Sequence, residues 1–354
     1  TVPVSDVLTP GTQRDGSFPL ASPQETDVYR FTVPVDGDPG SGVELTSSFF
    51  FDFVSIAGGG AYLRFFDPFG AQVVAQQFST DLEPFSLTQP GEYVLLLEGN
   101  VGNTAATTYS FNLKPVTNQT FVDGSPQFSL NQVVAGQINE SGEVDRYTFT
   151  LSSARTLYFD SMTNDGNLRW TLSGPRGVEV NAQDFRVETL TALPVFNLPV
   201  GSYVLTVDGL GDVTPAYSFR LVDLSDPAQS TAVALNPIAT PATIPIDLNP
   251  ANEAAFYRIT GVQAGDRLFF DGPAVGTVAT WSLIVPLGNA LFNQQTLPSD
   301  PIVDAVVGGN YMLIIAGATS ATIPLSNTAS VTVQSNTPPG TFTTNYNVGD
   351  VASG

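Results

Sequence analysis

The sequence predicts an all-β protein made of three tandem antiparallel β-sandwiches. Three observations support this fold class. The 354 residues include 32 Gly and 27 Pro, and only 13% are charged. This composition is poor in the Lys and Glu that long surface helices need. One sequence pattern occurs three times at a spacing of roughly 110 to 120 residues, which is the size of a domain. Apolar residues alternate with polar ones inside these repeats, with the period of two that marks a half-buried strand.

Three elements recur in each repeat. The first is an alternating strand with a central tyrosine at 25–31, 143–149 and 253–259. The second is a strand that ends in a Gly turn at 63–70, 168–177 and 281–288, and the third is a Gly-x-Tyr strand at 91–99, 201–209 and 309–317. Their shared tyrosines are predicted to be structural residues of the cores: Tyr29, Tyr147, Tyr257, Tyr93, Tyr203 and Tyr311.

The repeats divide the chain at 1–116, 117–228 and 229–340. The first two also share a closing Tyr-x-Phe strand, at 109–113 and 217–221, whereas the third has only the weaker match 329–334. Residues 341–354 either begin a fourth repeat or supply the closing strand of the third. At this size, a sandwich of about seven to nine strands can bury a core without disulfides.

Parity assigns side chains to the two faces of each predicted strand. Tyr29 and Phe31 share one face and are expected to point inward, with Arg30 outward. Trp170 and Trp281 occupy one position of the middle strand, where the first repeat has Leu63. A position filled by either Trp or Leu is predicted to lie in the core rather than on a sugar-binding platform.

These elements resemble the bacterial pre-peptidase C-terminal domain. The resemblance rests on the acidic-x-Asp-x-Tyr-x-Phe opening, the Pro-x-Gly end of the middle strand at 67–70 and 174–177, and the Gly-x-Tyr-x-Leu strand. It covers nearly the whole chain. The third repeat departs from it, because Ala255 replaces the Asp and the closing Tyr-x-Phe is missing. The resemblance implies a jelly-roll-like sandwich outside the cell with an accessory or spacer role, in some cases with calcium or polymer binding.

Composition excludes several classes of function. The chain has 12 basic and 33 acidic residues, for a net charge of -21, so neither nucleic acid nor an anionic membrane surface is an expected partner. No apolar run is long enough to predict membrane insertion. The chain lacks both Cys and His, which removes thiol, imidazole and Ser-His-Asp chemistry. Pairs of carboxylates could still serve a hydrolase, but the distinctive residues are repeated, so we expect no enzyme activity.

Five aspartates are candidate calcium ligands, because calcium binds hard oxygen atoms. Asp27 and Asp145 recur at one position of the opening strand, and Asp36, Asp38 and Asp165 lie in two loops rich in Asp, Asn and Gly. The alternative is that these carboxylates accept hydrogen bonds from nearby backbone or form turns. No complete calcium site is predicted.

A run of phenylalanines in the first repeat is the candidate partner surface. Phe49, Phe50, Phe51 and Phe53 cannot all face inward on one strand, so some are expected to be exposed or to lie in a contact between domains.

The predicted function is a non-catalytic structural segment of a large secreted or cell-surface bacterial protein: a spacer, stalk, adhesin or surface-assembly scaffold. Its expected partners are neighbouring domains of the same long chain or copies of itself. The alternative is a module that binds polysaccharide or another extracellular polymer through the exposed aromatic residues of the first repeat.

Overall fold

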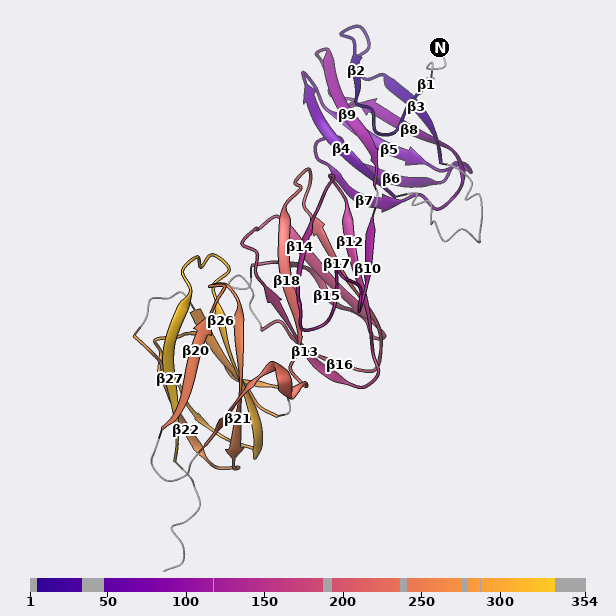
Figure 1. Ribbon diagram of the computed structural model, residues 1–354. Helices are drawn as coiled ribbons and strands as arrows, with labels where there is room; N and C mark the ends of the chain where they lie inside the picture. Colours follow the sequence, from indigo (N-terminus) through magenta and orange to yellow (C-terminus); the bar gives the residue numbers. More distant parts are fainter. Residues whose placement is uncertain are drawn as a thin grey trace, which may run out of the picture. The chain divides into compact units, whose positions relative to one another are not determined.

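The computed structural model describes residues 5–33, 48–116, 118–186, 193–235, 241–274, 279–286 and 288–334. In this part of the chain, strands form six sheets that pair into three successive β-sandwiches, so the predicted fold class is confirmed (Figure 1). Residues 341–354, which were expected to begin a fourth repeat or close the third, lie outside the described residues, as do Asp36 and Asp38.

The first sandwich packs a five-stranded sheet against a four-stranded one. The five-stranded sheet has the order β1 (Ser5–Val7), β3 (Thr26–Val33), β8 (Gly91–Gly99), β5 (Ala61–Phe66) and β6 (Gln72–Gln77). The four-stranded sheet has the order β2 (Arg14–Phe18), β9 (Thr107–Pro115), β4 (Ser48–Ala57) and β7 (Leu82–Ser86). One apolar cluster draws on both sheets and includes Tyr29, Phe31 and Leu63.

The second sandwich repeats this topology. Its five-stranded sheet has the order β10 (Gln119–Val122), β12 (Val144–Leu151), β17 (Gly201–Gly209), β14 (Leu168–Gly174) and β15 (Gly177–Asp184). Its four-stranded sheet has the order β11 (Val133–Gln137), β18 (Ala216–Asp223), β13 (Arg155–Ser161) and β16 (Val195–Leu198). A short 3₁₀ helix, η2 (Pro227–Gln229), follows β18, and Asp226 caps it by accepting a hydrogen bond from Ala228 N.

The third sandwich has the same strand order again. Its five-stranded sheet consists of β19 (Thr231–Ala234), β21 (Ala254–Val262), β26 (Gly309–Gly317), β23 (Ala279–Ile284) and β24 (Ala290–Thr296). Its four-stranded sheet consists of β20 (Ala242–Leu248), β27 (Leu325–Gln334), β22 (Arg267–Asp271) and β25 (Ile302–Asp304). Trp170 and Trp281 are 1% and 0% exposed in their sandwiches, as predicted for core positions.

One pairing differs from the expected antiparallel pattern. The first strand of each sandwich, β1, β10 or β19, lies at the edge of the five-stranded sheet and pairs in parallel with β3, β12 or β21. These edge strands are only three or four residues long, which is too short for a sequence alternation to reveal them.

The repeated Pro-x-Gly and Gly-x-Tyr motifs form one structural contact. In the second sandwich, Gly201 has φ +149°, and a Cβ on it would lie 2.2 Å from Cγ of Pro175, so only glycine fits against the proline ring. Two residues later, Tyr203 turns its ring into the core and donates its hydroxyl to the Pro199 carbonyl at 2.7 Å. The same contact recurs between Gly91 and Pro68 and between Gly309 and Pro286.

Residue contacts divide the chain into two compact units. The first comprises Thr1–Ser153, Asn164–Arg186 and Pro199–Phe219, and the second comprises Ala154–Thr163, Val187–Leu198 and Arg220–Gly354. Each unit therefore contains one whole sandwich together with part of the second. Among the described residues, no helix has the length and apolar character needed to cross a bilayer.

Candidate functional site

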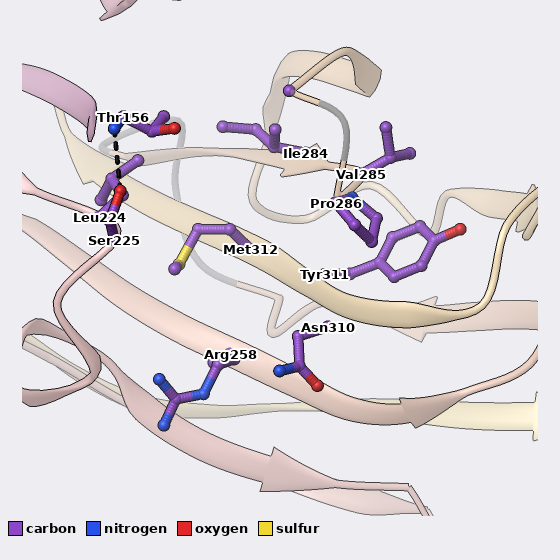
Figure 2. A pocket seen from close by; sticks show the side chains of 11 residues that line it. Thr156, Leu224, Ser225, Arg258, Ile284, Val285, Pro286, Asn310, Tyr311 and Met312 are labelled. Atoms are coloured by element: carbon purple, nitrogen blue, oxygen red, sulfur yellow. Dashed lines mark hydrogen bonds between the residues drawn. The ribbon is translucent and has the colours of Figure 1, made fainter. Parts of the chain in front are cut away.

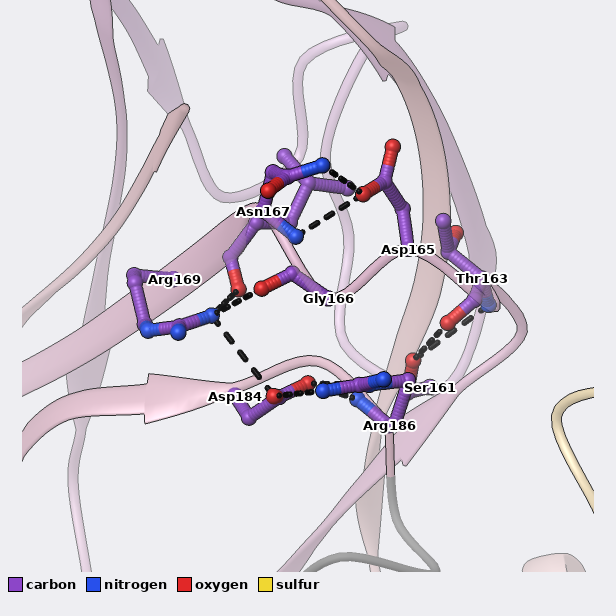
Figure 3. A network of polar contacts seen from close by, with 9 residues as sticks. Ser161, Thr163, Asp165, Gly166, Asn167, Arg169, Asp184 and Arg186 are labelled. Carbon is purple, nitrogen blue, oxygen red and sulfur yellow. Dashed lines mark hydrogen bonds and ion pairs between the residues drawn. The ribbon is translucent and has the colours of Figure 1, made fainter. Parts of the chain in front are cut away.

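The predicted ligand Asp165 closes a turn. Its Oδ1 accepts hydrogen bonds from the Asn167 backbone N–H at 2.8 Å and from the Asn167 side-chain amide at 3.1 Å. Figure 3 shows this turn joined to an ionic group through Arg169, which donates to the Gly166 carbonyl at 2.7 Å and pairs with Asp184 at 3.7 Å; Asp184 also pairs with Arg186 at 2.7 Å. These contacts correspond to the alternative raised for this loop, an Asx turn.

The predicted ligands Asp27 and Asp145 each end a chain of hydroxyl groups inside a sandwich. In the second sandwich, the hydroxyls of Tyr147 and Tyr217 lie 2.6 Å apart, and Tyr217 donates to Asp145 Oδ2 at 2.5 Å. Burial raises the pKa of Asp145 to about 6, and the charge of Glu143 adds to the increase, while the Tyr217 hydrogen bond opposes it. The carboxylate therefore accepts a tyrosine hydroxyl at the edge of the core.

The first sandwich contains the same chain of groups. Tyr29 and Tyr109 place their hydroxyls 2.7 Å apart, and Tyr109 donates to Asp27 Oδ2. Burial again raises the pKa of the aspartate. A glycine makes room for each closing tyrosine, because a Cβ on Gly16 or Gly136 would fall 2.2 or 2.5 Å from the Tyr109 or Tyr217 ring.

The third sandwich lacks this chain, and three positions change together. Ala255 replaces the aspartate, Ala329 replaces the closing tyrosine, and Ile244 occupies the strand position that faces Ala329. Ile244 is fully buried, so its side chain fills space that the tyrosine ring takes elsewhere. Tyr257 instead donates its hydroxyl to the Pro245 carbonyl. The missing Asp and the missing closing Tyr are thus one coupled exchange.

The phenylalanine run was expected either to be partly exposed or to lie in a contact between domains, and its side chains are largely buried. Phe49 and Phe51 are 6% and 0% exposed and belong to the core of the first sandwich, and Phe53 packs against that core. Phe50 points to the opposite face, as the period of two requires, but it is 0% exposed as well. A Cβ on Gly142 would lie 2.6 Å from the Phe50 Cβ, so the turn at Gly142 in the second sandwich covers this ring. Phe50 therefore lies in a contact between domains, which is one of the two outcomes expected for this run.

This contact between the first two sandwiches, here called the first junction, carries an acidic cluster. Carboxylate oxygens of Asp52, Asp81 and Asp212 lie within 4.8 Å of one another, and this is the only group of metal-ligating type found among the described residues. Lys114, the only lysine in the chain, pairs with Asp52 at 2.7 Å and with Asp212 at 3.3 Å. Its Nζ also lies 5.6 Å from the centre of the Phe50 ring.

Electrostatics at the first junction favour a cation. Burial raises the pKa of Asp81, and Asp212 and Asp52 raise it further. Burial by itself would lower the pKa of Lys114, but the hydrogen bond and charge of Asp52 outweigh it, and the pKa is raised. The ammonium group thus supplies positive charge to two carboxylates of a cluster whose oxygen atoms are of the kind that bind divalent ions. In the sequence, the one distinctive feature of this site is that Lys114 is the only lysine.

Replacing Lys114 with Gln should lower the free energy of unfolding by about 2 kcal/mol, because it leaves the largely buried Asp52 without its counter-charge. Calcium chloride should then raise the melting temperature of K114Q more than that of the parent protein, since an ion bound only to the folded state stabilises it. Differential scanning fluorimetry with and without chelator measures both effects. R176Q, which removes the same charge from an exposed pair with Glu179, is the matched control. An equal calcium shift in the parent protein and K114Q would show that Lys114 does not substitute for an ion.

The contact between the second and third sandwiches, here called the second junction, is apolar with a buried ion pair. Its apolar side chains pack in one cluster, which includes Tyr158, Leu224, Phe256 and Ile314. Within it, the Arg220 guanidinium donates to Asp160 Oδ2 at 2.5 Å and to the Ala254 carbonyl at 2.8 Å.

A pocket of about 230 Å³ lies in the second compact unit. Thr156 and Ser225 form one side, and Arg258, Met312 and Ile284 on the five-stranded sheet of the third sandwich form the other (Figure 2). Ser225 Oγ accepts the Thr156 backbone N–H at 2.9 Å, which leaves the hydroxyl hydrogen able to donate. No pattern in the sequence predicts this pocket.

Comparisons with known proteins identify no family. No family model matches the chain, and no curated protein matches it. Among solved structures, the CUB1-EGF-CUB2 domains of rat MASP-1 are similar to this chain at 10% sequence identity and a TM-score of 0.18. That match covers 61% of this chain and 100% of the other.

Proposed function

We propose that this chain is a non-catalytic structural segment of a large repeat protein, in which the sandwiches act as spacers held together at their junctions. The observation that carries this proposal is the second junction. Asp160 is 2% exposed, and its partner Arg220 also donates to the Ala254 backbone in the next sandwich. Placing a buried charge pair in a contact between domains is costly unless the contact stays closed.

The roles of the repeated residues support the proposal. The six tyrosines shared by the repeats are all buried, and the aspartates at the recurrent position accept tyrosine hydroxyls. Repeated residues are thus engaged in holding the sandwiches together internally. The resemblance of the motifs to the pre-peptidase C-terminal domain supports a location outside the cell, either secreted or at the surface of a bacterium.

Distance measurements between spin labels test the proposal. Because the chain has no Cys, introduced cysteines would be the only labelling sites. One pair at Val101 and Val178 reports on the first junction, and a second pair at Ala154 and Ile323 reports on the second; all four residues are exposed. Closed junctions should give a narrow distance distribution for both pairs.

Two variants make this measurement specific. R220M should broaden the distribution of the pair at Ala154 and Ile323 while leaving the other pair narrow, and K114Q should have the reverse effect. Broad distributions in the parent protein would overturn the proposal of a closed spacer in favour of a flexible tether.

A further inference from the structure

Two basic residues differ from all others in this chain. Ten of the 12 basic residues form ion pairs with carboxylates. Arg146 and Arg258 have neither an ion pair nor a side-chain hydrogen bond within the described part of the chain. In a protein with 33 acidic residues, an arginine without a carboxylate partner is unexpected, because negative charge is abundant around it.

Comparison of the first and third sandwiches shows why Arg258 has no carboxylate partner in the described part of the chain. In the first sandwich, the corresponding Arg30 pairs with Glu92 at 2.5 Å. Strand register makes the positions equivalent, since Phe31 faces Tyr93 in the first sandwich and Ile259 faces Tyr311 in the third. The residue before the tyrosine is Glu92 in the first case and Asn310 in the third. An amide therefore stands where the first sandwich has its carboxylate.

Arg258 and Asn310 both line the pocket of the second compact unit, where Figure 2 shows them on neighbouring strands. The other walls are mainly apolar and comprise Leu224, Ile284, Val285, Pro286 and Met312. Ser225 adds a hydroxyl. The site therefore combines a guanidinium, an amide and a hydroxyl, all able to donate, with an aliphatic surface.

We propose that this pocket binds a small carboxylate ligand with an apolar body. The guanidinium can hold a carboxylate through two parallel hydrogen bonds. The carboxylate of the ligand is then the negative partner that Asn310 does not provide. The aliphatic walls cover the body of the ligand. The volume of about 230 Å³ limits the ligand to a small molecule or to the last residue of a peptide. This inference does not depend on the spacer function.

The two methionines of the chain provide the measurement. Met312 lines the pocket and Met162 does not, so protein labelled with [¹³C-methyl]methionine gives one reporter signal and one internal control. Titration with sodium benzoate should shift the Met312 methyl signal, with a dissociation constant on the order of 1 mM for a ligand of this size. Benzamide has the same shape without the charge and should bind at least about tenfold more weakly.

Three variants separate this site from general anion binding. R258Q should weaken benzoate binding about tenfold or more. N310E places a carboxylate beside Arg258, at the position that Glu92 has in the first sandwich. It should abolish binding because the new side chain forms an ion pair with the Arg258 guanidinium. R146Q removes the other unpaired arginine, which does not line the pocket, and should bind benzoate like the parent protein. An unchanged Met162 signal and melting temperature show that each variant is folded.

The source of the carboxylate is tested by a second probe. N-acetylleucinate presents the carboxylate of a chain terminus, and benzoate represents a free acid. Tighter binding of N-acetylleucinate points to a peptide end, and tighter binding of benzoate points to a small metabolite. If neither probe shifts Met312, or if R258Q and R146Q weaken binding equally, the proposal is wrong.

Discussion

Replacing Arg220 with Met should lower the free energy of unfolding by about 3 to 5 kcal/mol at pH 7, because it leaves the Asp160 carboxylate buried without its counter-charge. Asp160 is 2% exposed, and Arg220 supplies two N–H donors to its Oδ2. Urea denaturation followed by Trp170 fluorescence, in a background where Trp281 is replaced by Phe, reports on the second sandwich, since these are the only two tryptophans.

The loss caused by R220M should depend on pH. Burial raises the pKa of Asp160 to about 6, and the charge and hydrogen bonds of Arg220 oppose that increase. A carboxyl group whose pKa is raised by folding binds its proton at a higher pH in the folded state than in the unfolded state. The stability from this group is therefore greatest at low pH and declines as the pH rises from about 4 to about 6. Without Arg220 the pKa rises further, so the effect of R220M should be smaller at pH 5 than at pH 7.

D160N combined with R220M is the control for this interpretation. Asn keeps an oxygen that can accept the Ala254 N–H, which lies 3.3 Å from Asp160 Oδ2, but it carries no charge. The double variant should recover most of the lost stability at pH 7 and lose the pH dependence. A double variant as unstable as R220M would show that packing of the arginine, rather than its charge, matters.

Replacing Gly136 with Ile should destabilise the second sandwich by roughly 3 kcal/mol or more, since even a Cβ there would lie 2.5 Å from the Tyr217 ring. The third sandwich places Ile244 opposite Ala329 on the equivalent strand pair. G136I should therefore cost much less in a Y217A, D145A background, which reproduces the residues of the third sandwich.

A double-mutant cycle measures this coupling. Urea denaturation of G136I, of the Y217A and D145A pair and of the triple variant should give an interaction energy of about 2 to 3 kcal/mol. G102A, at a glycine whose Cβ would meet nothing within 4 Å, should be nearly neutral. Additive losses would mean that isoleucine and tyrosine do not compete for the same space.

The cores could be predicted from the sequence because their signals are local and repeated. Alternation with a period of two assigned Tyr29 and Phe31 inward, and both are buried. The same rule showed that Phe50 and Phe51 must take opposite faces, but it does not reveal that the turn at Gly142 covers the outer face. Whether such a face is exposed depends on a neighbouring domain and not on the strand itself.

The candidate sites could not be predicted because they join distant segments. Asp27 has an obvious candidate role as a ligand, yet its hydrogen-bond partner Tyr109 lies 82 residues away. The acidic cluster takes Asp52, Asp81 and Asp212 from three separate segments. Arg258 is distinguished only by comparison with Arg30 and Glu92, which requires the strand register.

The edge position of the first strand determines how a sandwich would respond to tension. A pulling force applied along the chain enters the second sandwich through β10 and leaves through β18. β10 spans four residues and has one neighbour, β12, whereas β18 lies between β11 and β13. Both strands bear the same tension, but β10 is held by one short pairing and β18 by two neighbours. We therefore expect the second sandwich to release its short edge strand before its core unravels.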